Sequence, residues 1–393
     1  MLMRRAMPCP IAPPILILIG IISIHALAVT RPTCSGRTMH AVTASAFGAP
    51  RNVLRLEANW PRPCAHKNTM LIRTAACSLS PGDWRMLSGE ASFAKKPDAF
   101  PYVPGLDVCG VVVENGAAET ETQKFAVGDK IVATWSGAFG TGGLAEYSLV
   151  DTSMAVPKPD GLSCLDAAAL ANSAGHALLA LRTAGVTPGD RVLILGGSGG
   201  VGSAMVQLAR VPEFGASFVA ATSSDFSLLA SLGVDQPIDH TREDWWSPKA
   251  MATQPFDVII DCAEGETAWR RVRDGNGVLK RGGRFVAVVI NDWHIQFTRW
   301  WHLFGFLLPP LGRVLRSQLV GAVTYAMYVQ SLDAAVLGEV LELASTGQLR
   351  AVVDSSGPFA FSSEGAAAAF DRLRSRHAKG KVVVAIDAMN GYT

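Results

Sequence analysis

Six consecutive residues could hold a phosphate group: Gly197, Ser198, Gly199, Gly200, Val201 and Gly202. They follow the spacing GxGxxG and lie between an apolar strand expected at Arg191–Leu195 and a helix expected at Ser203–Arg210. Glycines allow a tight turn and let backbone amides approach a pyrophosphate, which then lies at the positive end of the helix. An α/β protein that has lost its ligand could keep such a turn. In this strand–loop–helix setting, however, the motif predicts a dinucleotide-binding site.

The residues after the next expected strand bear on which dinucleotide is bound. That strand, Phe218–Ala221, is followed by Thr222, Ser223 and Ser224, whereas an NAD site would place an Asp or Glu there for the ribose hydroxyls. Small hydroxyl side chains leave room for a 2′-phosphate and can donate hydrogen bonds to it. Asp225 is an opposing signal, but it comes a residue or two late. The sequence therefore favours NADPH.

The cysteines and the charges exclude other classes of protein. The seven cysteines are an odd number, irregularly spaced and without a CxxC pair, so neither a disulfide framework nor a structural zinc site is indicated. The net charge is +2, and Lys and Arg are scattered along the chain, so no nucleic-acid partner is expected. With 49% hydrophobic and 17% charged residues, the composition fits a well-buried α/β enzyme.

Five stretches of the chain carry a resemblance to a known family. Together they are specific to the medium-chain dehydrogenase/reductases, and the chain resembles the zinc-independent quinone oxidoreductase branch over roughly residues 39–387. Within that branch it is most similar to the mitochondrial reticulon-interacting oxidoreductases. The stretches are Ser80–Arg85 with Gly89, Pro104–Val112, Gly143–Tyr147, Gly189–Gly202 and His377–Lys381.

The resemblance implies an α/β fold, in which a GroES-like, β-rich catalytic domain carries an inserted Rossmann domain with a doubly wound parallel sheet. It also implies NADPH contacts at Ser198, Gly200 and Val201, with Ser223 near the 2′-phosphate. His240 stands where relatives often have a Tyr that reaches the same phosphate. The other implied contacts are Cys262 and Val288 beside the nicotinamide, and His377, Ala378 and Lys379 in an element that closes over the cofactor. That element is His-Ala-Arg in the family, and Lys in place of Arg keeps the charge but loses the bidentate fork.

The zinc ligands of the superfamily are missing from this chain. Zinc alcohol dehydrogenases carry Gly-His-Glu where this sequence has Gly105-Leu106-Asp107. No group of four cysteines supplies a structural metal either. Cys77 lies near a zinc-ligand position of the family, but without the His it is expected to be a small buried side chain. The sequence therefore predicts no metal site, and oxidation of a metal-bound alkoxide is not expected.

Two further departures concern residues near the reacting centre. Ser80 replaces an Asn that usually precedes the Pro in the family, and His176 replaces a Thr that normally faces the nicotinamide. His176 could donate a proton, although a histidine at the start of a helix is often a packed or capping residue. No motif singles out a proton donor among the tyrosines of the folded region, which are Tyr102, Tyr147, Tyr325 and Tyr328.

Two kinds of structure must position these residues. Residues 39–161 read as many short strands with glycine turns, which indicates a barrel-like catalytic domain. Residues 162–346 alternate helices with buried strands, which indicates a parallel NADPH-binding sheet with helices on both faces. Residues 347–393 return to strand-like texture and are expected to complete the first domain. Beyond those named above, the expected strands are Met39–Thr43, Thr69–Ala75, Val108–Glu114, Lys130–Thr134, Ala145–Val150, Asp257–Asp261, Arg284–Val289 after a turn at Arg281–Gly283, Ala351–Val353 and Lys381–Ile386, and a helix is expected at Asp166–Ala184.

Residues 1–38 are expected to direct the protein to a compartment. Two arginines precede an uncharged stretch, Met7–Thr30, and Ala26-Leu27-Ala28 has the small-x-small pattern of a signal-peptidase site. The stretch is also long enough to remain as a signal anchor. An organelle presequence is the third interpretation, because no acidic residue occurs before position 57. The protein is therefore expected in the secretory pathway or, after a presequence, in a mitochondrion or plastid.

The segment Trp293–Leu315 is rich in tryptophan, phenylalanine and leucine. One interpretation is an interfacial patch that meets a membrane surface or a lipophilic quinone tail. The other is a hydrophobic edge buried in a homodimer interface or beneath the substrate cleft. Pro309-Pro310 is expected to interrupt any long amphipathic helix, which favours the second interpretation.

These observations lead to one expected function with two alternatives. Without a metal or an evident nucleophile, the expected chemistry is hydride transfer from NADPH to a small lipophilic acceptor, a quinone or an α,β-unsaturated carbonyl, held in the cleft between the domains. The oxygen of such an acceptor needs only hydrogen bonds or solvent protons. An enoyl-thioester reductase and a non-catalytic NADPH-binding interaction protein stay open as alternatives.

Overall fold

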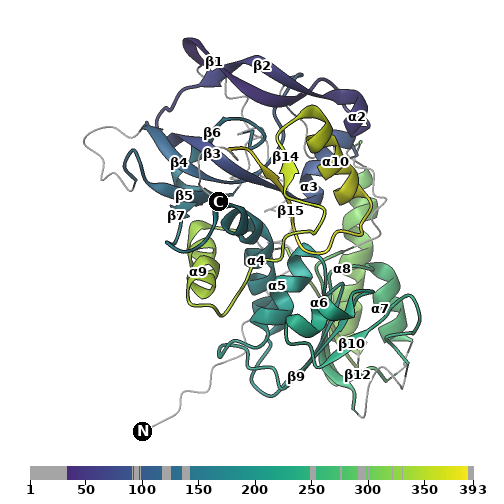
Figure 1. The fold of residues 1–393 in the computed structure, drawn as a ribbon. Coiled ribbons are helices and arrows are strands. Elements are labelled where there is room, and N and C mark those ends of the chain that lie inside the picture. Colours follow the sequence, from purple (N-terminus) through teal and green to yellow (C-terminus); the bar gives the residue numbers. More distant parts are fainter. Residues whose placement is uncertain are drawn as a thin grey trace.

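The computed structural model describes residues 33–387, apart from 91, 93–96, 98, 117–124, 135–141, 248–253, 275–276, 291–297, 300, 321 and 330. Most of the expected targeting segment, residues 1–32, lies outside the described part of the chain. Two large sheets and one two-stranded sheet form the fold. Figure 1 shows a β-rich half, coloured purple, blue and yellow, above a half in teal and green that holds the parallel sheet.

The first large sheet is built from both ends of the chain. Its strands are β3 (Thr69–Leu79), β4 (Asp107–Asn115), β5 (Lys130–Ala133), β6 (Tyr147–Asp151), β7 (Ala155–Pro157), β14 (Phe359–Ala360) and β15 (Val382–Ala385). The order is β14-β15-β3-β4-β5-β7, with β6 also paired to β3. β15 runs antiparallel to β3, so the tail completes the sheet begun near the N-terminus. Figure 1 shows yellow β14 and β15 in the half of the molecule that holds the blue strands.

A hairpin of two strands lies at the end of this half in Figure 1. β1 (Thr33–Ala44) pairs antiparallel with β2 (Leu54–Pro63), and the short helix α2 (Pro50–Val53) precedes β2. β1 begins at Thr33 rather than at Met39, so residues 33–38 of the expected targeting segment pair with β2. Cys64, directly after β2, is disulfide-bonded. The number and spacing of the cysteines indicated no disulfide framework, and the structure shows that at least this one cysteine is disulfide-bonded.

The second large sheet has six parallel strands. They are β8 (Arg191–Leu195), β9 (Phe218–Thr222), β10 (Gln236–Ile238), β11 (Phe256–Asp261), β12 (Leu279–Ala287) and β13 (Thr324–Met327), in the order β10-β9-β8-β11-β12-β13. In this doubly wound order the winding reverses between β8 and β11, and ligands bind outside the carboxyl ends of the strands at that point. The turn expected at Arg281–Gly283 lies within β12, where the pairing with β11 shifts register and Gly282 has a φ of +79°.

The helix α4 (Cys164–Ala184) lies between the two large sheets and contacts strands of both. Ser163 caps its first turn, and left-handed Gly185 ends it. Among the described residues it is the one helix long and apolar enough to cross a membrane, but 78% of its most apolar window is buried inside the protein. Here it serves as the core helix. The others are α3 (Pro81–Ser88), α5 (Gly200–Leu208), α6 (Phe226–Ser231), α7 (Glu266–Arg273), α8 (His302–Val320), α9 (Ala334–Ser345) and α10 (Ser363–Arg374), with the 3₁₀ turn η1 (Thr152–Met154).

α8 continues through Pro309 and Pro310, so the expectation that these prolines interrupt the helix is wrong. Each proline removes one backbone donor, but the helix buries Leu307 and Val314, and this tertiary packing outweighs the loss. The opposite face exposes large apolar side chains, namely Phe304, Leu308, Leu315 and Leu319. The first part of the segment Trp293–Leu315, residues 293–297 and 300, lies outside the described residues.

Candidate cofactor-binding and active site

At two positions of the loop after β8, the structure has room only for glycine. A Cβ atom on Gly202 would lie 2.1 Å from the carbonyl oxygen of Gly196, and one on Gly197 would lie 2.6 Å from the Cβ of Ala221. Without these atoms, α5 packs directly against the turn, and the turn packs directly against β9. This close helix–strand packing is what the glycine pattern of a dinucleotide-binding loop provides.

The predicted loop residues come together at the start of α5. The helix begins at Gly200, and its N-cap, Gly199, has no side chain that could cap the first turn. Backbone N–H groups in the first turn of a helix have no acceptor within the helix, and their partial positive charge favours an anion. The amides of Gly200, Val201 and Gly202 therefore suit a pyrophosphate, as the motif predicts.

Two neighbouring segments hold the loop in place. Thr222, at the end of β9, accepts hydrogen bonds from the backbone N–H of Gly196 on Oγ1 (2.8 Å) and from that of Gly197 on its carbonyl oxygen (3.0 Å). On the other side of the loop, the N–H of Gly380 donates to the carbonyl oxygen of Ser198 at 2.7 Å. The last contact joins the C-terminal tail to the glycine loop.

The side chain of Lys379 points at the serines that follow β9. Its Nζ donates to Ser224 Oγ at 3.0 Å and lies 3.5 Å from Ser223 Oγ. Ser223 is buried and accepts the N–H of Asp225 at 2.9 Å, whereas Ser224 is exposed. The structure thus brings together two residues that the sequence predicts, Ser223 and Lys379. It adds Ser224, which the sequence could not separate from its neighbour because the direction in which the chain leaves β9 decides which serine faces outward.

Asp354 positions Lys379. Its carboxylate accepts the backbone N–H of Lys379 at 2.7 Å and a bidentate pair of bonds from Arg372, with the shortest at 2.8 Å. Burial opposes ionisation of Asp354, but the bonds from Arg372, Lys379 and Ser356 outweigh burial and hold its pKa below the usual value. The cation at position 379 is therefore supplied by a well-anchored segment of the tail.

Asp225, which argued against NADPH in the sequence, has another partner in the structure. Its Oδ1 accepts the N–H of Leu228 at 3.0 Å and the hydroxyl of Ser227 at 2.8 Å, and so caps α6. These bonds lower the pKa of Asp225. An NAD site needs a carboxylate that is free to accept the ribose hydroxyls, and here that carboxylate is engaged by the helix.

Three other predicted residues lie around the edge of this site. His240 lies in an exposed turn after β10, and the end of β10 accepts the N–H of Ser223 on the carbonyl of Ile238 at 3.0 Å. His377 is exposed as well, and its N–H donates to Ser375 Oγ at 3.2 Å. Ala378 packs against the core of the catalytic sheet. In the described part of the chain no hydrogen bond joins either imidazole to the glycine loop.

Cys262 and Val288 lie at the carboxyl ends of β11 and β12. The N–H of Cys262 donates to Leu195 at 3.1 Å, and that of Val288 donates to the carbonyl of Asp261 at 3.0 Å. The buried side chain of Asp261 fixes the turn after β11 by accepting three backbone N–H groups, at 2.6 to 2.9 Å. Burial raises the pKa of Asp261 to about 7, and these bonds oppose the rise. Both predicted residues thus stand beside the winding reversal.

Ser80 lies at the start of α3 and is tied to a buried carboxyl group. Its N–H and its hydroxyl both donate to Asp83 Oδ2, at 2.7 and 2.9 Å. Burial and the charge of Asp107 raise the pKa of Asp83 to about 6. Asp83 Oδ1 and the hydroxyl of Tyr102 are buried and have no hydrogen-bond partner among the described residues. The structure therefore gives Ser80 a capping contact and draws attention to Asp83, which the sequence did not single out.

His176 contacts a tyrosine from the far edge of the parallel sheet. Its Nδ1 lies 2.6 Å from the hydroxyl oxygen of Tyr328, which follows β13 directly. The sequence separated these residues by most of the Rossmann-type domain, so no local spacing could join them. Tyr328 is the functional candidate that sequence reasoning missed.

A buried ion pair joins the C-terminal tail to β4 at the position of the missing zinc ligands. Lys381 Nζ lies 3.2 Å from Asp107 Oδ2, and Thr134 donates to Asp107 Oδ1 at 2.6 Å. The stem of Lys381 passes Gly200, where an added Cβ would lie 3.5 Å from Lys381 Cδ. Cys77 is fully buried, and burial raises the pKa of its thiol well above the usual value. Within the described ranges no three His, Cys, Asp or Glu side chains are grouped to hold a metal ion.

The comparisons with known families agree with this architecture. The model of the alcohol dehydrogenase GroES-like domain matches residues 66–160, and that of the zinc-binding dehydrogenases matches residues 232–384. The chain belongs to the medium-chain dehydrogenase/reductases, in their quinone oxidoreductase branch. The expected fold class, a GroES-like catalytic domain with an inserted Rossmann domain, is confirmed.

Individual relatives narrow the comparison. The chain is 33% identical to the 2-methylene-furan-3-one reductase of Solanum lycopersicum, over 85% of this chain and 76% of that protein. It is 32% identical to the chloroplastic NADPH-dependent alkenal/one oxidoreductase of Arabidopsis thaliana (91% and 82%) and 30% identical to the mitochondrial NAD(P)H oxidoreductase RTN4IP1 of Mus musculus (84% and 85%). The resemblance to the reticulon-interacting proteins is thus confirmed. The structure of the quinone oxidoreductase from Coxiella burnetii matches with a TM-score of 0.70 and 27% identity, over 89% of this chain and 99% of that one.

Proposed function

We propose that the protein transfers hydride from NADPH to a quinone or an α,β-unsaturated carbonyl without a metal ion. The observation that carries this proposal is Lys379 Nζ beside Ser223 and Ser224, at the edge of a glycine loop that suits a pyrophosphate. A cation and small hydroxyls at this place suit the 2′-phosphate that distinguishes NADPH from NADH. The relative from Arabidopsis thaliana, which is named as NADPH-dependent, supports the same choice.

NADPH, when bound, supplies the hydride, and the residues of this chain hold and orient it. The amides at the start of α5 would hold the pyrophosphate, Lys379 and Ser224 would hold the 2′-phosphate, and the ends of β11 and β12 would border the nicotinamide. The proposed cofactor-binding set is Gly197, Ser198, Gly199, Gly200, Val201, Gly202, Ser223, Ser224, His240, Cys262, Val288, His377, Ala378 and Lys379.

The proposed acceptor is a conjugated carbonyl compound for a physical reason. Hydride addition to a quinone or an enone places the new negative charge on an oxygen, which hydrogen bonds can stabilise without a Lewis acid. Asp107 stands where zinc enzymes of the superfamily have their Glu, and it is paired with Lys381. The names of the relatives, a furanone reductase, an alkenal/one oxidoreductase and a quinone oxidoreductase, support this class of acceptor.

The direct test is NADPH oxidation by protein that lacks residues 1–32, against a panel of quinones, enals, enones and enoyl thioesters. We expect turnover of quinones and enones, and no loss of turnover after treatment with a strong chelator. Turnover of enoyl thioesters alone would replace the proposed acceptor with the thioester alternative. Saturable NADPH binding without turnover of any acceptor would favour a non-catalytic interaction protein.

A charge-removing variant tests the cofactor proposal. Lys379→Met should weaken NADPH binding about 10- to 100-fold, because a charge-assisted hydrogen bond contributes about 1.5–3 kcal/mol. NADH has no 2′-phosphate, so its dissociation constant should change less than about twofold. Lys67→Met, in the turn before β3, is the matched control and should leave both constants unchanged. Equal weakening of both cofactors by Lys379→Met would contradict the assignment of Lys379 to the 2′-phosphate.

We also propose that the segment before Thr33 is an organelle presequence, since curated relatives are named chloroplastic and mitochondrial. A fusion of residues 1–38 to a fluorescent protein should localise to a plastid or mitochondrion. Retention in the endoplasmic reticulum or secretion would instead support the signal-peptide or signal-anchor interpretation.

A further inference from the structure

His176 and Tyr328 form a hydrogen-bonded pair between the two halves of the molecule. His176 Nδ1 lies 2.6 Å from the Tyr328 hydroxyl oxygen, and the two rings meet edge to face, with centroids 5.5 Å apart at an interplanar angle of 85°. His176 comes from α4, the helix between the sheets, and Tyr328 comes from the end of β13. The contact has the length of a strong hydrogen bond. When Nδ1 carries the proton, His176 donates to the phenol oxygen, and the proton of Tyr328 stays free for another acceptor.

Local structure brings these two residues together. The N–H of Tyr328 donates to the carbonyl of Ala287 at 2.9 Å, which carries the parallel pairing of β12 and β13 past the end of the strand. The chain then crosses α4 at Gly175, where an added Cβ would lie 2.5 Å from Leu332 Cδ2. The glycine next to His176 therefore leaves room for the Leu332 side chain, which would have to shift if position 175 carried a Cβ.

The pair lies at the carboxyl end of the parallel sheet, where the nicotinamide of a bound cofactor is expected. A dinucleotide crosses the winding reversal outside the carboxyl ends of the strands, with its pyrophosphate at the helix after the first strand. Here that helix is α5, after β8, and Lys379 beside Ser223 and Ser224 would hold the adenosine half toward β9. The nicotinamide half would then lie toward β11 and β12. Ala287, which accepts the N–H of Tyr328, directly precedes Val288 at the end of β12.

We propose that Tyr328 is the proton donor of the reaction and that His176 orients it and restores its proton. This role depends on the proposed function. Hydride from NADPH forms the new C–H bond at the β-carbon of an enone, and the electrons of the C=C bond move toward the carbonyl oxygen. The Tyr328 O–H bond breaks, and its proton goes to the α-carbon of the resulting enolate. The proton on His176 Nδ1 passes to the tyrosinate, and the other ring nitrogen takes a proton from water. One NADPH and one proton are consumed for each saturated ketone formed.

The environment of Tyr328 suits a donor. The residue is 7% exposed, and burial raises the pKa of its phenol, so the hydroxyl keeps its proton until an anion forms beside it. His176 is only half-buried and can exchange protons with solvent. Because His176 acts through Tyr328, it is a positioning residue.

The two acceptor classes need this proton to different extents. A quinone that has accepted hydride becomes an aromatic hydroquinone anion, which is stable and can take its proton from water. An enone becomes an enolate, and its product forms only when carbon is protonated. Loss of the Tyr328 hydroxyl should therefore slow enone reduction far more than quinone reduction, and this contrast separates proton donation from a packing role.

Tyr328→Phe tests the proposal, with Tyr325→Phe as the matched control on the same strand. We expect Tyr328→Phe to lower kcat for an enone about 100-fold, as the loss of a general acid does. Quinone kcat should fall less than about fivefold, and the NADPH dissociation constant should stay unchanged. The solvent deuterium isotope effect on enone reduction should rise as protonation becomes limiting. Tyr325→Phe should match the unmodified protein, and His176→Thr should lower enone kcat about tenfold with the same rise in isotope effect.

Three outcomes would overturn the role of Tyr328. Enone turnover within about twofold of normal in Tyr328→Phe would remove it while leaving the proposed function intact. An equal loss with both acceptors, together with weaker NADPH binding, would assign Tyr328 to packing. Failure of the unmodified protein to reduce any acceptor would overturn the proposed function itself, and the donor role with it.

Discussion

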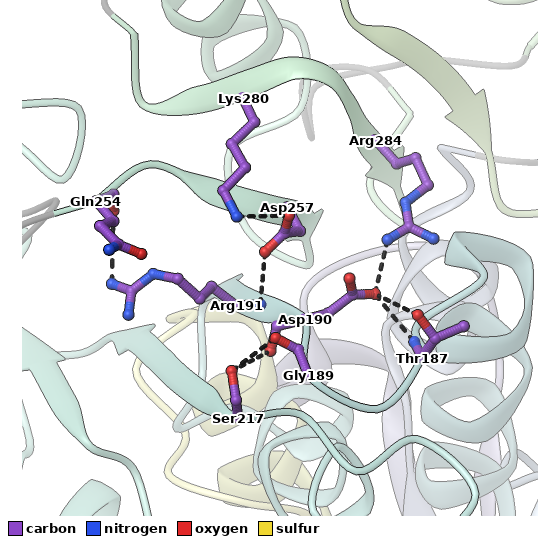
Figure 2. Close-up of polar contacts among 9 residues, drawn as sticks. All are labelled: Thr187, Gly189, Asp190, Arg191, Ser217, Gln254, Asp257, Lys280 and Arg284. Atoms are coloured by element: carbon purple, nitrogen blue, oxygen red, sulfur yellow. Dashed lines mark hydrogen bonds and ion pairs between the residues drawn. The ribbon is translucent and has the colours of Figure 1, made fainter.

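The two ends of the parallel sheet differ in how their polar groups are used. At the amino ends of β8, β9, β11 and β12, charged groups satisfy one another, as Figure 2 shows. Asp190 accepts bonds from the N–H and hydroxyl of Thr187 (2.9 and 3.2 Å) and from Arg284 (2.7 Å). Asp257 accepts the N–H of Arg191 at 2.9 Å and pairs with Lys280 at 2.7 Å.

At the carboxyl ends the polar groups instead surround the proposed cofactor site. The first turn of α5 presents amides, Lys379 presents an ammonium group, and His176 holds the hydroxyl of Tyr328. Each end is ordered by the same six strands. We infer that internal pairing at the amino end stabilises the sheet, whereas the donors at the carboxyl end serve the proposed cofactor site. Variants at the two ends should therefore separate stability from activity.

The glycine loop should show the largest effect. Gly202→Ala places a Cβ 2.1 Å from a backbone oxygen of the loop, and relieving that overlap should cost at least about 3 kcal/mol, or more than 100-fold in NADPH affinity. Isothermal titration with NADPH measures the loss. Gly338→Ala in α9 is the control, because its nearest neighbour is 3.9 Å away and alanine is favoured there by up to about 1 kcal/mol. Normal NADPH binding by Gly202→Ala would contradict the close packing of α5.

The amino end should give the opposite result. Asp190→Ala leaves Arg284 Nη2 and the N–H of Thr187 without their acceptor, at a site where the Asp190 side chain is 14% exposed, although Arg284 Nη1 keeps its bond to the carbonyl of Gly185. We expect a loss of about 3 kcal/mol in the free energy of unfolding, measured in urea. Specific activity of the folded protein and NADPH affinity should not change. Asp274→Ala, an exposed carboxylate paired with Arg273, should cost less than about 0.5 kcal/mol. A large fall in kcat for folded Asp190→Ala would mean that the two ends are coupled.

The sequence predicted the carboxyl end well wherever the pattern was local. The strand Arg191–Leu195 has the expected bounds, because a compact apolar run beside a glycine loop is both a strand signal and a ligand signal. Ser223 and Lys379 were predicted from their motifs, and the structure brings them together. In each of these cases the residues that define the feature are neighbours in sequence or match a family pattern.

Features that depend on tertiary packing were missed. The strand Leu54–Pro63 contains two prolines and mostly exposed residues, so only its pairing with β1 reveals it. α8 passes through Pro309 and Pro310 because its inner face is buried. Tyr328 could not be chosen among the tyrosines until β13 placed it against His176. The contacts of the amino end likewise join residues from separate strands.

A buried carboxyl group extends the comparison to a pH dependence. Asp257, at the amino end, is paired. Burial opposes its ionisation, but the bonds from Lys280 and Arg191 outweigh burial and lower its pKa. Its contribution to stability is therefore present at neutral pH and is lost as the pH falls. Asp83, with one oxygen unpartnered among the described residues, has the reverse shift, from 3.8 to about 6. Well below pH 4 it is protonated in both the folded and the unfolded state. As the pH rises from about 4 to about 6, the unfolded state ionises while folded Asp83 keeps its proton, so stability falls over this range and levels off above it.

Asp83→Asn should remove that penalty. The amide oxygen can accept the two bonds from Ser80 that Asp83 Oδ2 accepts now. The variant should be as stable as the unmodified protein near pH 4 and more stable above pH 7 by up to about 3 kcal/mol. Urea unfolding at several pH values measures the difference. A difference that does not grow between pH 4 and pH 7 would show that Asp83 is ionised in the folded protein throughout this range.

An exposed ion-pair cluster should show the smallest effect and tests whether burial matters in the comparison. Arg182, in the last turn of α4, donates to Glu213 (2.8 and 3.0 Å) and to Glu339 in α9 (3.0 Å), and each of the three side chains is at least 35% exposed. Arg182→Met should cost less than about 1 kcal/mol in the free energy of unfolding. The cost should shrink in about 1 M salt, because screening shortens the reach of exposed charges to about 3 Å. More of the cost of Asp190→Ala should persist in the same salt, because the Asp190 side chain is only 14% exposed and part of the cost is the loss of hydrogen bonds from Thr187, which salt screens little. If Arg182→Met cost as much as Asp190→Ala in high salt, pairing alone, rather than pairing with burial, would account for the stability of the amino end.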